Sequence, residues 1–97
     1  MSSSGQPEAA GRMQRALVAF QKAQSVLLTT HRKLKGLPAE EVDRFWAAQG
    51  KQIEHHIRAA AVEGTAAFNA FSAAGLVASA NDRHLVSEAQ RHLAEGS

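Results

Sequence analysis

Two histidines and a glutamate near the end of this 97-residue chain have the spacing of a helical ligand row. His84, Glu88 and His92 stand four residues apart, so on a helix all three project to roughly one side. A zinc site needs three or four ligands that converge on one point, with further groups to orient them. These three side chains instead form a line along the helix axis. We therefore expect no metal site, and a helical metal-binding protein is kept as an alternative.

The other residues that could do chemistry are dispersed. His55 and His56 are adjacent and lie about 100° apart around a helix, so they do not converge. His31 falls on an apolar stripe, where we expect a hydrogen-bonded histidine at a helix interface. The chain has no cysteine, no Gly-x-Ser-x-Gly nucleophile motif and no glycine-rich phosphate loop. We expect no catalytic residue and no cofactor, and hence no enzyme.

A repeat of apolar residues at alternating intervals of four and three predicts a long first helix. Pro7 suits its first turn, and Gly36 followed by Pro38 ends it. Residues 1–6, rich in serine and glycine, are expected to form a disordered tail, and residues 7–97 a single helical domain. The stripe consists of Met13, Leu17, Phe20, Gln24, Leu27, His31 and Leu34.

A second apolar stripe follows Pro38 and keeps its helical phase for about 40 residues. Gly50 and Gly64 lie within it, and each costs about 1 kcal/mol relative to alanine. The sequence leaves two alternatives: one continuous helix about 60 Å long, or two helices with a break at Gly64-Thr65. The stripe consists of Val42, Trp46, Ile53, Ile57, Ala60, Gly64, Phe68, Phe71, Gly75 and Ala78.

The sequence "SANDR" predicts the start of a short last helix at about residues 82–94. Ser79, Asn81 and Asp82 all have side-chain oxygens that can accept from free helix amides. No segment shows strand alternation. The predicted fold class is all-α: two long antiparallel helices plus a short C-terminal helix.

Charge is distributed unevenly. Residues 1–36 carry a net charge of +5 and residues 37–97 carry −3. These charges complement each other within the fold or across a dimer, or they serve an acidic or nucleic-acid partner. The basic residues spread around the polar face without aromatic residues for base stacking, so we do not expect nucleic-acid binding, and a helical nucleic-acid-binding protein is kept as an alternative. No signal peptide and no apolar run of about 20 residues are present, which predicts a cytoplasmic protein without a membrane span.

The stretch "GTAAFNAFSAAGLVASA", Gly64 to Ala80, is a surface of small residues with two phenylalanines, and such a surface suits close helix packing. Two long helices in so small a chain leave apolar surface uncovered. We expect a second copy or another protein to cover it, with a homodimer as the working form. The expected partner-binding residues are Phe45, Trp46, Ile53, Ile57, Phe68 and Phe71.

Two resemblances to known families add to this interpretation. The segments "THRKL" (30–34), "IEHHI" (53–57) and "FNAFSAAG" (68–75) are similar to helical segments of the small all-α quorum-sensing antiactivators of the TraM and QslA kind. This resemblance implies a helical dimer that binds a LuxR-type transcriptional activator and prevents it from binding DNA. The segment "FWAAQG" (45–50) resembles the WXG100 secreted helical hairpins, although Trp46 and Gly50 stand four residues apart rather than two. The second resemblance implies export and is the alternative.

Overall fold

Three α-helices make up the part of the chain that the structure, a computed structural model, describes, residues 5–95. Helix α1 spans Gly5–Leu34, α2 spans Ala39–Ala73 and α3 spans Ala80–Glu95, and no strand occurs within those residues. The predicted all-α class, with two long helices and a short last one, is confirmed. Residues 1–4 of the predicted tail lie outside the described residues, whereas Gly5 and Gln6 belong to α1.

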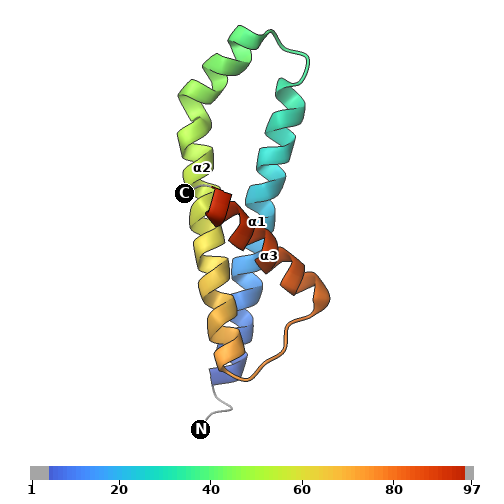
Figure 1. Cartoon of the computed structure of the whole chain (residues 1–97), viewed down its shortest axis with the longest axis vertical. Coiled ribbons are helices and arrows are strands. Elements are labelled where there is room, and N and C mark those ends of the chain that lie inside the picture. The colour runs from blue at the N-terminus through green and yellow to red at the C-terminus, as the bar shows by residue number, and fades with distance from the viewer. Residues whose placement is uncertain (1–4, 96–97) are drawn as a thin grey trace.

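Helix α2 turns back along α1, and α3 lies across the pair (Figure 1). Arg12, early in α1, bonds to Glu63 in the second half of α2. His31, late in α1, lies beside Trp46 in the second turn of α2. We call α1, α2 and the turn that joins them the hairpin.

The turn of the hairpin forms where the sequence places a glycine before a proline. Gly36 has a φ of 96°, a left-handed conformation that side chains rarely tolerate. The amide of Leu37 donates to the carbonyl of Leu34. Pro38 is the N-cap of α2, and its carbonyl accepts from the amides of Glu41 and Val42. The predicted end of the first helix at Gly36 is therefore confirmed.

Helix α2 runs through Gly50 and Gly64 without a break. The hydroxyl of Thr65 donates to the carbonyl of Ala61, so its polar group is satisfied inside the helix and does not compete with it. The helix ends instead at Gly75, where φ is 83°. The amide of Gly75 donates to Ser72 and that of Leu76 to Phe71, which is the Schellman pattern of helix termination.

Helix α3 begins at the predicted cap. The Ser79 hydroxyl accepts a hydrogen bond of 3.1 Å from the amide of Asp82, which satisfies one of the free amides of the first turn. His92, in the last turn, lies 3.3 Å from a carboxylate oxygen of Glu54. This contact ties the far end of α3 to the middle of α2.

All three helices contribute to two core clusters. The first core cluster consists of Met13, Ala16, Leu17, Ala67, Phe71, Ala78 and Val86. The second core cluster consists of Phe20, Ala23, Ile57, Ala61 and Ala89. Alanine at four of these positions on α1 and α2 lets the helices approach closely, and no polar residue is buried among residues 5–95. Both clusters lie in the part of the hairpin that α3 crosses.

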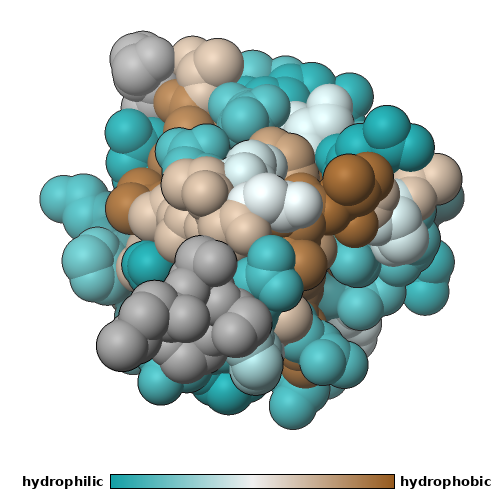
Figure 2. Space-filling model, turned by 90° about the horizontal axis from the view of Figure 1, so that it is seen from below, coloured by the Kyte–Doolittle hydropathy of each residue, from teal (hydrophilic) through white to brown (hydrophobic). Residues whose placement is uncertain are grey.

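At the end of the molecule opposite the turn, contacts within the chain hold α1 and α2 together. Gln6 donates to the carbonyl of Ala74, which links the start of α1 to the end of α2. Figure 2 looks at this end, where hydrophobic and intermediate residues gather in the middle and hydrophilic residues surround them. Val77 is exposed, and its neighbour Leu76 packs against the first core cluster.

The molecule is elongated, with principal extents of 58 × 21 × 18 Å. Its radius of gyration is 16.3 Å, whereas a compact domain of this length has about 12.5 Å. Helix α3 crosses only part of the hairpin, and Figure 1 shows α1 and α2 further apart near their turn than where α3 lies. The turn end therefore has two helices and no third layer.

Candidate functional site

The turn end of the hairpin is an apolar region without a core of its own. We define the hairpin tip as residues 26–53: the last turns of α1, the turn, and the first half of α2. No tip residue is a member of either core cluster, and only Leu27 packs against one. Leu34 is buried in the tip outside both clusters. The tip thus holds apolar side chains that α3 does not cover.

An aromatic group lies across the tip. The rings of His31 and Trp46 have centroids 5.1 Å apart, and Phe45 meets Trp46 edge to face at 5.3 Å. Phe45 and Trp46 are half-buried, and His31 is exposed. No hydrogen bond joins the His31 ring to another described residue, so ring contact takes the place of the expected hydrogen bond.

Aliphatic side chains extend this surface into solvent. Val26 is 54% exposed, Leu28 57% and Leu37 44%. Val42 and Ile53 are half-buried on α2. Sequence reasoning did not single out Val26, Leu28 or Leu37 because none of them falls on the predicted stripes. All three lie in the tip and belong to neither core cluster.

A shallow groove leads from the tip toward the core. Ala23 and Val26 line it on α1, and Gln49, Gln52, Ile53 and His56 line it on α2. Its walls come from both long helices, and its lining mixes aliphatic side chains with amides and an imidazole. Such a lining suits a partner helix that presents both apolar and polar residues.

The charges of the tip have no partners within the described chain. Arg32, Lys33 and Lys35 close α1, and Glu40, Glu41 and Asp43 open α2. None of these six side chains forms an ion pair with a residue in the range 5–95. The two ends of the helices that meet at the turn therefore present opposite, uncompensated charge.

One ion pair joins α1 to α2, and it lies away from the tip. Two guanidinium nitrogens of Arg12 donate to the two carboxylate oxygens of Glu63 at 2.8 and 2.9 Å. The hydrogen bond from Arg12 holds the pKa of Glu63 below its usual value. Of the six basic residues in positions 1–36, only Arg12 is neutralised in this way. The uneven charge predicted from the sequence is thus mostly not cancelled within the described residues.

The six expected partner-binding residues divide into two groups. Phe45, Trp46 and Ile53 lie in the tip. Ile57 is 2% exposed in the second core cluster and Phe71 is 8% exposed in the first. Phe68 packs against the first core cluster. In this conformation the chain's own helices bury Ile57 and Phe71, whereas Phe68 is half-buried like the three tip residues.

The histidine row on α3 does not assemble into a ligand set. Glu88 forms an ion pair with Arg91 and lies 3.7 Å from His84. His92 faces Glu54 of α2 instead. Among residues 5–95, no group of three or more histidine, cysteine, aspartate or glutamate side chains is close enough to hold a metal ion.

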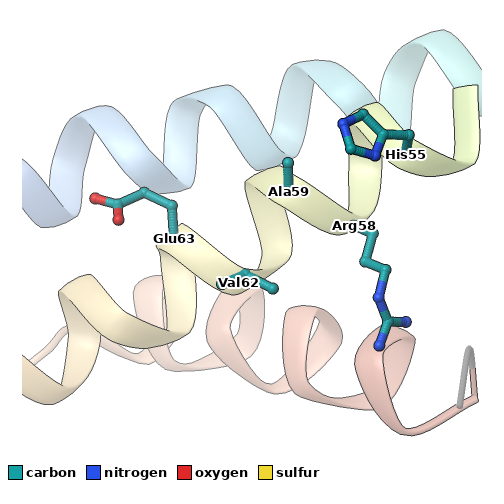
Figure 3. A pocket seen from close by; sticks show the side chains of 5 residues that line it. All are labelled: His55, Arg58, Ala59, Val62 and Glu63. Atoms are coloured by element: carbon teal, nitrogen blue, oxygen red, sulfur yellow. The ribbon is translucent and has the colours of Figure 1, made fainter. Parts of the chain in front are cut away.

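A hollow on the outer side of α2 lacks the features of an active site. His55, Arg58, Ala59, Val62 and Glu63 line it, and all five come from this one helix (Figure 3). Arg58 points toward α3, and Glu63 points away from it along the opposite side of the helix. Since no second element forms a wall, this is an open depression between long side chains.

No helix of the described residues is long and apolar enough to cross a membrane. Comparison of the chain with protein-family models, with curated proteins and with solved structures gives no match.

Proposed function

We propose that this protein is a non-enzymatic regulator that acts by binding another protein through the hairpin tip. The observation that supports this proposal is the position of Trp46, the only tryptophan, with Phe45 and Ile53 outside both core clusters. Tryptophan is among the residues that contribute most to protein–protein affinity. An apolar surface rimmed by charged groups is typical of an interaction site.

In this proposal the two long helices act as an antiparallel hairpin, and the working form is a homodimer or a complex with another helical protein. The groove between Val26 and Ile53 supports this, because its two walls come from different helices. A partner helix could place its apolar side chains between them, as in other helix-in-groove complexes.

The more specific form of the proposal is an antiactivator that binds a LuxR-type transcriptional activator in the cytoplasm and blocks its DNA binding. Its support is the resemblance of short segments. "THRKL" (30–34) lies within the tip, and "IEHHI" begins at Ile53, the last residue of the tip. The third segment, "FNAFSAAG" (68–75), lies outside the tip, so the part of the resemblance that coincides with the uncovered surface is "THRKL" and Ile53.

A DNA-binding assay tests this proposal. A LuxR-type activator from the same host is bound to its labelled operator, and the purified protein is added at increasing concentration. The proposal predicts stoichiometric release of the activator. It also predicts that Trp46→Ala raises the required concentration by more than about tenfold, as expected of a hot-spot residue.

Arg15→Glu is the matched control, since Arg15 is exposed on α1 outside the tip. It should release the activator as the wild type does. Unchanged DNA binding at saturating protein would contradict the antiactivator proposal. Equal effects of the two substitutions would contradict the assignment of the site to the tip.

A further inference from the structure

We propose that a second copy of this chain occupies the hairpin tip in the free protein, related to the first by a two-fold axis across the two tips. This inference rests on the proposal that the tip is a protein-docking surface, and it names the first occupant of that surface. The charge of the tip and the surface area of the chain support it independently.

The charge argument begins with the two helix ends at the turn. Arg32, Lys33 and Lys35 make the end of α1 basic, and the first turns of α2 are acidic on balance, with Glu40, Glu41 and Asp43 against one basic residue, Arg44. These groups are adjacent in the same molecule, yet none of them pairs with another within residues 5–95. Their partners must therefore come from another molecule if they are to be paired.

A two-fold axis supplies those partners from an identical copy. In such an interface the same surface is used twice, so any contact from the first element to the second is repeated in reverse. Tips that meet side by side with opposite directions place the basic end of α1 against the acidic start of α2 in the other copy. The tip is thus complementary to itself, with basic meeting acidic at two symmetric places.

The apolar residues fit the same arrangement. Leu37, 44% exposed at the turn, lies between the two charged segments. Val42, Phe45 and Trp46 follow on the first turns of α2. When two tips overlap, these side chains form the centre of the interface and the charged residues form its rim. This is the usual arrangement of a specific interface.

The surface area of the chain is consistent with an uncovered interface. The chain exposes 6694 Å², whereas a folded monomer of its mass exposes about 5,400 Å². The excess is spread over an elongated molecule, and it leaves room for the roughly 800 Å² that each partner contributes to an interface of standard size. Overlap of two tips would also add the missing helical layer over residues 26–53.

Exchange of charge between two variants tests this inference. Variant A carries Arg32→Glu, Lys33→Glu and Lys35→Glu, which makes the end of α1 acidic like the start of α2 and leaves Arg44 and Lys51 as the basic residues of the tip. Variant B carries Glu40→Lys, Glu41→Lys and Asp43→Lys, which makes its whole tip basic. Sedimentation equilibrium of each variant, of their equal mixture and of the wild type measures the dimer fraction, and circular dichroism checks the helix content.

The inference predicts that the wild type is a dimer whose dissociation constant rises with salt, because exposed charges are screened. Variants A and B should each dimerise at least about tenfold more weakly, since like charges then face each other. Their mixture should recover a dimer that contains one copy of each. Arg15→Glu with Lys22→Glu, a charge reversal on α1 outside the tip, should leave the wild-type constant unchanged.

Leu37→Glu provides a second test if reversal of three charges disturbs the helix ends. Leu37 lies in the turn that joins α1 to α2 and belongs to neither core cluster. This substitution should therefore leave the helix content intact and weaken dimerisation at least about tenfold. A wild type that stays monomeric at all concentrations would overturn the inference. So would a dimer that none of the tip variants weakens.

Failure of this inference and failure of the proposed function give different results. A monomeric wild type that still releases the activator from DNA removes the self-pairing alone. A wild type that dimerises through its tip but never releases the activator removes the antiactivator role alone.

Discussion

Trp46 lies beside His31 with their ring centroids 5.1 Å apart. This contact joins α2 to α1 between their turn and the place where α3 crosses them (Figure 1). On the side of this contact away from the turn, all three helices form the core. Between this contact and the turn only two helices remain, and apart from the buried Leu34 their apolar side chains are half-buried or exposed.

Substitutions of three phenylalanines, two in the core and one in the tip, distinguish the roles of these two regions. Phe20 is fully buried in the second core cluster, so Phe20→Ala should lower the free energy of unfolding by about 3–5 kcal/mol. Phe71→Ala, also in the core, should do the same. Phe45→Ala should lower the stability of the monomer by less than about 1 kcal/mol, because only part of its ring is buried there. Urea unfolding at low protein concentration measures both effects, and equal losses would contradict the boundary.

Gly64→Ala should stabilise the chain by up to about 1 kcal/mol through helix propensity. A Cβ atom at this buried position would meet the Leu17 side chain at 3.8 Å, an ordinary van der Waals contact. Gly75→Ala is the matched control. Its φ of 83° costs a side chain roughly 1–2 kcal/mol, so thermal unfolding should shift in the opposite direction. Destabilisation by Gly64→Ala would mean that α1 and α2 pack more tightly than the structure has them.

The Arg12–Glu63 pair should make stability depend on pH in the acid range. Because the hydrogen bond from Arg12 lowers the pKa of Glu63 in the folded chain, the pair stabilises the fold above the unfolded pKa. That stability is lost as the pH falls through the lowered folded pKa. The effect is small, since both side chains are about half exposed and exposed pairs contribute little.

Thermal unfolding between pH 6 and pH 2, a range that spans the ordinary glutamate pKa of about 4.3, measures this contribution. Glu63→Gln should reduce the loss of Tm on acidification relative to the wild type. Arg12→Gln should do so as well, because it removes the same hydrogen bonds. Identical pH profiles for the wild type and both variants would show that the pair contributes nothing.

Ser79→Ala should lower stability by about 1 kcal/mol, because it removes the side-chain acceptor at the start of α3. Ser87→Ala is the control, since Ser87 is exposed within the same helix and alanine is the better helix former there. Hydrogen exchange of the α3 amides should increase in the first variant and not in the second. If both variants exchange alike, the cap at Ser79 does not hold the helix.

Much of the fold follows from periodicity in the sequence. Met13, Leu17 and Phe20 of the first predicted stripe are buried, because a 3.6-residue period specifies which face of a helix turns inward, whereas His31 of the same stripe is exposed. Gly36 and Ser79 mark helix ends through local chemistry that does not depend on the rest of the chain. The sequence left open whether α2 continues through Gly64. Helix propensity disfavours glycine there, but tertiary packing can override propensity, so the sequence alone does not decide.

The division of the second stripe could not be predicted. Ile57 and Phe71 share a stripe with Trp46, yet the chain's own helices bury the first two and leave the third at the surface. What separates them is how far α3, with 16 residues, reaches along α2, with 35. That reach depends on the crossing of α3 over the hairpin, and helical periodicity carries no information about it.

The emission of Trp46 tests the central claim most directly, since it is the only tryptophan and the chain has no tyrosine. Fluorescence and acrylamide quenching are recorded as the protein is diluted from a dimer-forming concentration, and again as the activator is added. If another polypeptide covers the tip, the emission shifts to longer wavelength and quenching increases on dilution, and the activator reverses both changes. An emission spectrum and quenching constant that stay the same at every concentration, with and without the activator, would contradict the claim that the tip is a docking surface.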